Sequence, residues 1–186
     1  MKSGPLSPFH HNFRVPGRQV EGPIRYAVGQ TVHGMVLVGR SRQGICAIFL
    51  GENAQDLYEQ LAVAFPDVEL MADQQSMLGE LGQVVAFADK GTAESVIDLD
   101  IGGTSFQQEV YRSLCAIPRG QTRSYREIAQ HLGVPESVRA VAGACAANVL
   151  AVAIPCHRII RSNGTISGYR WGVDQKHALL ANECGQ

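Results

Sequence analysis

The sequence of 186 residues has none of the long apolar segments that place a chain in a membrane. No apolar run approaches the roughly 20 residues that a membrane-spanning helix needs, and residues 1–20 contain no apolar signal core. We therefore expect neither a membrane partner nor secretion. The composition, 45% apolar and 18% charged, is instead typical of a folded globular chain, and it shows no internal repeat.

Cysteine is scarce, and no two cysteines are spaced as a CxxC pair. The five cysteines are Cys46, Cys115, Cys145, Cys156 and Cys184. An odd set without such pairs argues against a disulfide framework and against a four-cysteine zinc site. We expect reduced thiols in a cytoplasm, with no metal and no cofactor. The adjacent His10 and His11 are interpreted as surface residues.

Net charge is close to zero, at −1, but the charges are unevenly distributed. Residues 1–100 hold seven basic and twelve acidic side chains, whereas residues 101–186 hold nine basic and five acidic ones. The positive excess predicts that a polyanionic partner would meet the C-terminal part. A chance distribution of ordinary surface charges explains the same numbers, so charge alone does not choose between the two interpretations.

Two boundaries are expected along the chain. Residues 1–23 contain several adjacent Gly and Pro residues and no sustained period, which is typical of a flexible leader. The pair Gly102-Gly103 is a natural domain boundary. We therefore expect an α/β domain over residues 24–101 and a second domain over residues 102–186.

The α/β domain is predicted from short β-branched stretches punctuated by glycines and followed by helical spacing. The expected elements are three strands of a small antiparallel sheet, two helices and one edge strand: Ile24–Val28, Met35–Val38, Ile45–Leu50, Ala54–Phe65, Gln74–Asp89 and Ile97–Asp100. Pro66 ends the first of these helices.

The second domain is predicted to be mainly helical. The expected helices are Thr104–Leu114, Tyr125–Leu132 and Glu136–Ala147. Ser124 and Glu127 have the spacing of a capping box at the start of the second helix. The last two helices resemble a helix-turn-helix, although many helical hairpins share this pattern. The last helix is rich in Ala and Gly, so its backbone can lie close against another surface.

The most informative segment is Ile154-Pro155-Cys156-His157-Arg158-Ile159-Ile160. A thiolate is a nucleophile, and because a free thiol has a pKa of about 8.5, a catalytic cysteine needs a base or a positive field nearby. His157 and Arg158 are residues of these two kinds beside Cys156. A buried, inert cysteine next to a surface histidine explains the segment equally well when it is considered alone.

Residues around this segment resemble those of the O6-alkylguanine-DNA alkyltransferases, also called methylated-DNA–protein-cysteine methyltransferases. The matching elements are Ser124-Tyr125, Arg139-Ala140-Val141, Asn148, Pro155-Cys156-His157-Arg158, Gly168-Tyr169 and Leu179-Leu180-Ala181-Asn182-Glu183. The similarity is greatest to the C-terminal halves of bacterial adaptive-response proteins and extends from about Ile24 to Glu183. It implies an N-terminal α/β domain of ribonuclease-H-like fold, followed by a mainly helical, winged-helix-like domain.

The resemblance implies DNA repair by direct reversal. Cys156 would attack the alkyl carbon on guanine O6, or on O4 of thymine, and keep the alkyl group as a thioether, so each molecule would act once. His157 would take the thiol proton through a water, with Glu183 orienting the imidazole, as in a catalytic triad. Tyr125 would donate its phenolic proton to the departing base.

The resemblance also implies how DNA is bound. A stacked base cannot reach a thiol, so the alkylated guanine would be flipped out of double-stranded DNA, with the protein in the minor groove and Arg139 filling the vacated stack. The residues implied for DNA contact are Ser124, Tyr125, Arg139, Ala140 and Gly143. Those implied for the substrate pocket are Asn148, Ile159, Tyr169, Arg170 and Trp171. We expect a monomer.

Two departures from family patterns qualify the resemblance. The sequence does not contain the four-cysteine, zinc-binding half of the adaptive-response proteins, so phosphotriester repair and transcriptional activation are not expected. Trp171 stands where other members have small residues. We hypothesise that Trp171, with Ala151, narrows the pocket and disfavours bulky benzyl groups.

Three other functions fit parts of the pattern. A non-enzymatic alkyltransferase-like protein would recognise lesions without repairing them, but such proteins carry another residue at the position of Cys156. A transcription factor would use the helix-turn-helix and would leave Cys156, His157 and Glu183 unexplained. A thiol hydrolase would need a set of oxyanion donors, which the sequence does not reveal.

Overall fold

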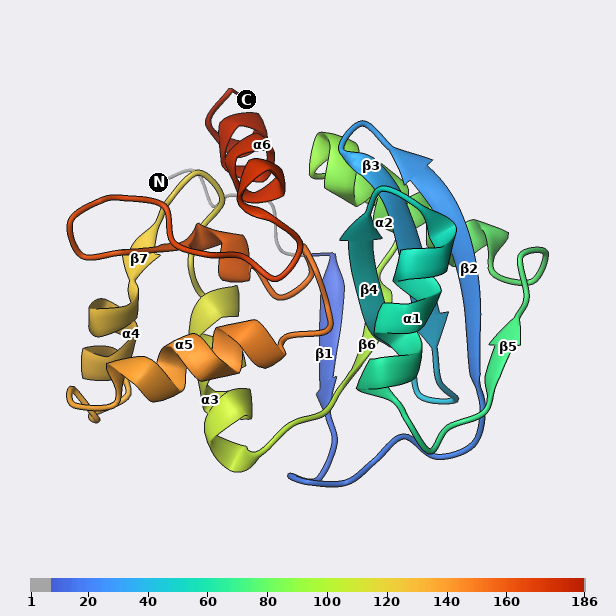
Figure 1. The fold of residues 1–186 in the computed structure, drawn as a ribbon, viewed down its shortest axis with the longest axis horizontal. Helices are drawn as coiled ribbons and strands as arrows, with labels where there is room; N and C mark the ends of the chain where they lie inside the picture. The colour runs from blue at the N-terminus through green and yellow to red at the C-terminus, as the bar shows by residue number, and fades with distance from the viewer. Residues whose placement is uncertain (1–7, 186) are drawn as a thin grey trace. The chain divides into compact units, whose positions relative to one another are not determined.

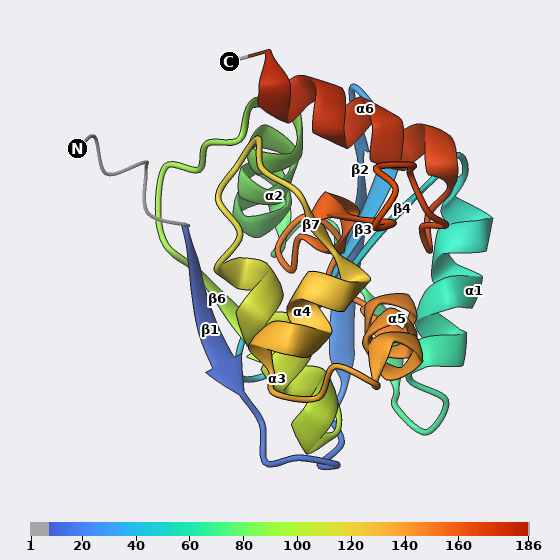
Figure 2. The same ribbon diagram turned by 90° about the vertical axis from the view of Figure 1, so that its left-hand side faces the viewer.

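A computed structural model describes residues 8–185, and the chain divides into two compact units. The units are residues 1–102 and residues 103–186, so the division falls between Gly102 and Gly103 (Figures 1 and 2). Gly103 has a φ of +114°, a backbone conformation that residues with a Cβ rarely adopt. Glycine therefore suits the backbone at the residue where the second unit begins.

The first unit is a six-stranded mixed sheet with two helices (Figure 1). Its elements are β1 (Phe9–Phe13), β2 (Ile24–Thr31), β3 (Gly34–Arg40), β4 (Ile45–Gly51), α1 (Ala54–Ala64), β5 (Leu70–Ala72), α2 (Leu78–Lys90) and β6 (Ile97–Ile101). The strand order is β1-β6-β4-β3-β2-β5. Strands β2, β3 and β4 form the predicted antiparallel meander, whereas the β1–β6, β4–β6 and β2–β5 pairs are parallel. The prediction of a small antiparallel sheet is therefore wrong in its extent.

The two helices cover opposite faces of this sheet. Gly39 of β3 lies against Leu61 of α1, and Gly29 of β2 lies against Leu81 of α2. Gly29 pairs with Val36 of β3, so these two residues face the same side of the sheet. Side chains alternate between the two sides along a strand, and Val36 and Gly39 are an odd number of residues apart. Gly29 and Gly39 therefore face opposite sides. Strand β4 is apolar throughout and almost wholly buried, as expected for a strand covered on both faces.

The prediction of a flexible leader is wrong for residues 9–13. Residues 9–13 form β1, which pairs in parallel with all of β6, so β6 lies inside the sheet and not at the predicted edge. Phe9 is buried and packs edge-to-face on Phe87 of α2, with ring centroids 4.7 Å apart. The residues between Phe9 and Phe13 are polar, so this strand lacks the apolar pattern from which strands are predicted. Residues 1–7 of the predicted leader lie outside the described residues.

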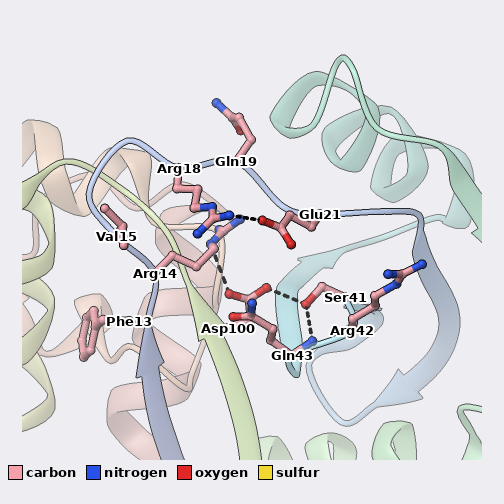
Figure 3. A pocket seen from close by; sticks show the side chains of 10 residues that line it. All are labelled: Phe13, Arg14, Val15, Arg18, Gln19, Glu21, Ser41, Arg42, Gln43 and Asp100. Atoms are coloured by element: carbon pink, nitrogen blue, oxygen red, sulfur yellow. Dashed lines mark hydrogen bonds and ion pairs between the residues drawn. The ribbon is translucent and has the colours of Figure 1, made fainter.

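A buried ion pair ties the segment after β1 to the sheet (Figure 3). Asp100 of β6 accepts a hydrogen bond of 2.5 Å from the Ser41 hydroxyl and pairs with Arg14 Nε at 3.1 Å. These residues belong to a cleft of about 340 Å³ lined by Phe13, Arg14, Val15, Arg18, Gln19, Glu21, Ser41, Arg42, Gln43 and Asp100. The buried carboxylate thus has both a hydroxyl and a cation as partners.

The second unit is mainly helical, as predicted. Its elements are α3 (Ser105–Cys115), β7 (Arg123–Ser124), α4 (Tyr125–His131), α5 (Val138–Ala147), the 3-10 turn η1 (Cys156–Arg158), β8 (Ile159–Ile160) and α6 (Val173–Cys184). Helices α3, α4 and α5 contact one another, and the Tyr111 hydroxyl donates to the Ala144 carbonyl at 3.2 Å. Strand β7 pairs with β8, which brings the start of α4 beside the residues that follow η1 (Figure 2). The ribonuclease-H-like and winged-helix-like descriptions stay predictions.

Capping residues set the starts of two helices in this unit. Thr104 and Gln107 form a capping box at α3, and the predicted box of Ser124 and Glu127 is confirmed at α4. Helix α5 starts at Val138, later than predicted, because the residues before it form a turn. Among the helices of residues 8–185, none combines the length and the apolar character that crossing a membrane requires.

Candidate active site

The Cys156 thiol lies at the start of η1, inside the second unit. The residue is 4% exposed, and burial raises the pKa of the thiol to about 11. A hydrogen bond of 3.2 Å from Asn148 Nδ2 to Sγ and the positive charge of Lys176 act in the opposite direction. At neutral pH the resting group is a thiol, so a base must remove its proton before the sulfur attacks.

Asn148 fixes the loop that leads to Cys156. Its Oδ1 accepts from the Leu150 N–H at 2.9 Å, and its Nδ2 donates to the Ile154 carbonyl at 3.0 Å. The amide is therefore bonded to the backbone on both sides of the loop that precedes Cys156. The loop contains Val152 at a φ of +60°, which is strained for a β-branched residue. The buried amide therefore holds a strained segment in the position that presents the sulfur.

His157 is buried and is hydrogen-bonded to Glu183 of α6, with Nε2 2.8 Å from Oε1. Burial lowers the pKa of His157, so the ring is neutral at neutral pH. An ionised carboxylate only accepts, so the ring proton belongs on Nε2 and the lone pair on Nδ1. Nδ1 is buried and has no hydrogen-bond partner among the described residues. It is therefore available as a general base.

Arg158 holds Glu183 in place, a role that the sequence did not reveal. Its Nε and Nη2 donate to the carboxylate over distances of 2.8–3.2 Å, and its Nη1 donates to the Ile117 carbonyl at 2.6 Å. Glu183 Oε2 also accepts from the Gly120 N–H at 3.2 Å. Burial alone would raise the pKa of Glu183, but hydrogen bonds from His157 and Arg158 lower it to about 2. The carboxylate is thus ionised, as the tautomer of His157 requires.

Tyr125, the first residue of α4, is half-buried and hydrogen-bonded to Ser167. Its hydroxyl oxygen lies 2.7 Å from Ser167 Oγ. Burial raises the pKa of Tyr125, and negative charge on Cys156 would raise it further. The phenol therefore keeps its proton at neutral pH and belongs to the same electrostatic site as the thiol.

Lys176 of α6 was also missed by the sequence reasoning. It is fully buried, and its Nζ donates to the Ile159 carbonyl and, at 3.0 Å, to Ser167 Oγ. A signal for it exists in the sequence, since Lys176, Leu179 and Glu183 recur at the spacing of one helix face. A lysine within such a buried stripe indicates a cation inside the protein.

Tyr169 lies beside the imidazole of His157, and Trp171 lies beside Tyr169. The Tyr169 ring is perpendicular to both neighbours, with its centroid 6.5 Å from His157 and 5.1 Å from Trp171. The Tyr169 hydroxyl is buried and lacks a hydrogen-bond partner within residues 8–185. Arg170, by contrast, is exposed and donates to the Ala146 carbonyl at the end of α5 at 3.2 Å.

The residues expected to contact DNA differ in exposure. Arg139, Ala140 and Gly143 lie on the exposed side of α5. A Cβ added to Gly143 would meet no atom within 4 Å, so packing inside the chain does not require glycine there. Ser124 is 7% exposed, and its hydroxyl accepts from the Glu127 N–H as a helix cap. Its contact with DNA stays a prediction.

Comparisons with known proteins identify the family. Residues 105–185 match the family described as 6-O-methylguanine DNA methyltransferase, DNA binding domain. The inducible methylated-DNA–protein-cysteine methyltransferase of Bacillus subtilis is 32% identical over 155 residues, which are 83% of this chain and 82% of that protein. The chain belongs to this methyltransferase family.

Two further similarities extend over most of the chain. Regulatory protein ada of Salmonella typhimurium is 44% identical over 92% of this chain but only 48% of its own length. The chain thus spans about half the length of the ada proteins that it matches. The crystal structure of Mycobacterium tuberculosis OGT in complex with DNA has 30% sequence identity and a TM-score of 0.71, covering 87% of this chain and 93% of that chain.

The methyltransferase fold brings most of the predicted site residues together. Asn148 contacts Cys156, Glu183 contacts His157, and Tyr169 lies beside His157. Tyr125 and Ile159 are joined to one another through Ser167 and Lys176. Arg170 contacts α5, and Ser124 acts as a cap. Among residues 8–185 no group of three or more His, Cys, Asp or Glu side chains is arranged to hold a metal ion.

Proposed function

We propose that this protein repairs DNA by transferring an alkyl group from guanine O6 to Cys156, and that each molecule acts once. The observation that carries the proposal is a buried thiol in the same site as a neutral His157, whose Nε2 is held by Glu183 and whose Nδ1 has no partner among the described residues. Such a nucleophile is activated only during the reaction, since the resting thiol is protonated. Membership of the family supports alkylated DNA as the substrate.

The reaction follows from the roles of four side chains. Cys156 Sγ attacks the alkyl carbon, forming an S–C bond as the C–O6 bond breaks and its electron pair stays on the base. His157 Nδ1 takes the thiol proton, through a water, and Glu183 stabilises the imidazolium. Tyr125 gives its phenolic proton to the base, which leaves more readily when protonated. A thioether does not revert to a thiol, so the reaction is stoichiometric. The same steps apply to O4-alkylthymine.

The proposed DNA partner is a duplex bound through the minor groove by the helix-turn-helix of α4 and α5, with the lesion flipped out. The small side chains Ala140 and Gly143 on the exposed side of α5 permit close approach, and Arg139 on that side fills the vacated stack. The minor groove distinguishes base pairs poorly, which suits repair in any sequence context. We expect affinity to fall as salt rises, because phosphate contacts dominate.

The proposed guanine pocket is bounded by Tyr169 and Trp171, with the carbonyls of Cys156 and Ile159 accepting from the guanine amino group. The Ile159 carbonyl already accepts from Lys176, and its second lone pair is available to the base. Arg170 joins this wall to α5. We further propose a monomer in the bacterial cytoplasm, since the five cysteines are all unpaired and suit a reducing compartment.

A titration with damaged duplex tests this function. Duplex containing one O6-methylguanine is mixed with increasing amounts of protein, and the remaining lesions are counted. We expect one lesion removed per protein molecule, and no repair of a second portion of duplex. Removal of more than one lesion per molecule would show a turnover enzyme. Binding of the lesion without its removal would favour the alternative, a lesion-recognition protein.

A further inference from the structure

A hydrogen-bonded chain links the Tyr125 phenol to a buried ammonium group. The Tyr125 hydroxyl lies 2.7 Å from Ser167 Oγ, and Ser167 Oγ lies 3.0 Å from Lys176 Nζ. Nζ also donates to the Ile159 carbonyl and lies 6.0 Å from the centre of the Tyr169 ring. All these residues belong to the second unit, so the connection is continuous within one compact body.

Lys176 occupies an unfavourable place for a positive charge. Its side chain is fully buried. Nζ donates to a carbonyl and a hydroxyl, lies near an aromatic ring, and interacts with the thiols of Cys156 and Cys145. A buried cation without a carboxylate partner is destabilising, and burial lowers the pKa of Lys176. This ammonium group therefore releases a proton more readily than an exposed lysine does.

The directions of the hydrogen bonds follow from the donors available. An ammonium group only donates, so Ser167 Oγ accepts from Lys176. The Ser167 hydrogen is then free to be donated to the Tyr125 oxygen. The Tyr125 hydrogen is in turn left to point toward a bound base. Ser167 is only 7% exposed, so bulk water does not compete for these bonds.

We propose that Ser167 and Lys176 form a proton relay that resupplies Tyr125 during alkyl transfer; the proposal rests on the function proposed above. As the C–O6 bond breaks, Tyr125 gives its proton to the base and Ser167 gives its hydroxyl proton to the Tyr125 oxygen. Lys176 then gives one ammonium proton to Ser167 Oγ. The relay leaves tyrosine, serine and the departing guanine neutral, and it leaves lysine as an uncharged amine.

The relay also balances charge in the buried site. The thiol proton goes to His157, which becomes positive, while Lys176 loses its positive charge. The net charge of the site is therefore the same before and after transfer. Without the relay, the products would include two buried cations, Lys176 and His157, and a phenolate, which is unfavourable in a poorly solvated interior. Ser167 and Lys176 act through Tyr125 and are positioning residues.

The test compares two methyl donors with different leaving groups. Single-turnover transfer to Cys156 is measured with duplex O6-methylguanine, whose base requires a proton, and with iodomethane, whose iodide requires none. Ser167→Ala is expected to slow transfer from the duplex roughly 10- to 100-fold and to leave the iodomethane rate unchanged. Ser167→Thr, which keeps the hydroxyl, is expected to recover part of the loss. Ser162→Ala, an exposed control in the same segment, is expected to change neither rate.

A solvent-isotope measurement follows the protons themselves. In mixtures of H2O and D2O, the unaltered protein is expected to show more than one proton moving in the transfer step from duplex. Ser167→Ala and Lys176→Met are expected to show fewer, because the relay is interrupted. The iodomethane rate and thermal melting establish that each variant remains folded with a reactive thiol.

The outcomes separate failure of the relay from failure of the function. Equal slowing of both methyl donors in Ser167→Ala would mean that the hydroxyl only shapes the site, and the relay would be wrong. Unchanged rates with both donors would also overturn it. An unaltered protein that reacts with iodomethane but not with O6-methylguanine in duplex would overturn the proposed function itself.

Discussion

Each unit of the molecule buries a cysteine close to an ion-paired carboxylate, and the two sites differ in what surrounds the sulfur. Cys46 of β4 is 0% exposed, and its Sγ donates to the Gly39 carbonyl at 3.6 Å. Burial and the nearby Asp100 raise the pKa of Cys46 to about 12. Cys156 is 4% exposed, and burial raises its pKa to about 11.

The pKa values of the two thiols differ too little to distinguish Cys46 from Cys156. The groups around each sulfur differ more. Beside Cys46, the Asp100 carboxylate accepts from Ser41 and pairs with Arg14, and none of these three residues is a histidine. Cys156 accepts from Asn148 and shares its site with a neutral imidazole that has an unoccupied Nδ1. We infer from the comparison that Cys156 is distinguished by the base and the donor in its site, and not by burial or a low resting pKa.

Removing each sulfur is the strongest test of this comparison. Cys156→Ala is expected to abolish methyl transfer while keeping lesion binding, because the bond-forming atom is gone. Cys46→Ala is expected to keep transfer and to lower the free energy of unfolding by about 1 kcal/mol through loss of core packing. Mass spectrometry and urea denaturation measure the two effects. Transfer that survives in Cys156→Ala would move the nucleophile elsewhere, with Cys145 the next thiol to test.

Neutralising each carboxylate is expected to have the next largest effect. Glu183→Gln should slow transfer roughly 100-fold, because His157 loses the group that fixes its tautomer and stabilises its charged form. The matched Asp100→Asn should leave the transfer rate unchanged but destabilise the fold by about 3 kcal/mol, because Arg14 keeps a buried charge. Single-turnover rates and denaturation check both variants. Equal loss of transfer in the two would break the comparison.

The pH dependence of folding stability provides a second test of the bonds that Glu183 makes with His157 and Arg158. The pKa of Glu183 falls from an ordinary 4.5 to about 2 in the folded chain, so the unfolded chain binds the proton first as pH decreases. The stabilisation, about 3 kcal/mol, is present above the unfolded pKa and is lost as pH falls through the folded pKa. Urea denaturation of the unaltered protein and Glu183→Gln should therefore give stabilities that converge on acidification. If the two stabilities instead changed in parallel as pH falls, Glu183 would not be ionised in the folded chain as described.

Replacing one arginine in each unit tests whether repair of duplex DNA depends on the second unit more than on the first. Arg139→Ala should slow repair of duplex roughly 30-fold, because a flipped base costs a few kcal/mol to hold out of the stack. Reaction with free O6-methylguanine should be unaffected. Arg42→Ala, which removes an exposed arginine of the first unit, should change duplex repair far less. Equal losses on duplex and free base would refute the role of Arg139.

The smallest expected effect concerns the choice of alkyl group. Trp171→Gly should speed transfer of a benzyl group roughly threefold to tenfold, because a bulky ring beside Tyr169 is removed. The methyl rate should change little. Rates are compared with O6-benzylguanine and O6-methylguanine as donors. An unchanged benzyl rate would show that Trp171 does not restrict the pocket.

Local patterns predicted the parts of the structure that depend on neighbours along the chain. The capping box of Ser124 and Glu127 and the extent of α1 are of this kind. Strand β1 could not be predicted in this way, because its partner β6 lies far along the sequence and its middle residues are polar. A strand of this type can be assigned only when its partner strand in the folded sheet is known.

The same limit applies to the candidate site. The motif around Cys156 indicated the family, together with the proposed nucleophile and base, because these depend on residue type and order. The contacts of Arg158 with Glu183 and of Ser167 with Tyr125 join segments that are distant in sequence. No local pattern states which buried donor meets which acceptor, so these supporting residues required the folded structure.

The central claim is that the groups around the sulfur select Cys156 from among the buried cysteines. The most direct measurement maps the transferred group after reaction with duplex containing one O6-methylguanine with an isotopically labelled methyl. The chain is then digested, and the labelled cysteine is identified by tandem mass spectrometry. We predict one label per molecule, on Cys156 alone, with Cys46 unmodified. A label on Cys46 or Cys145, or labels spread over several cysteines, would contradict the account.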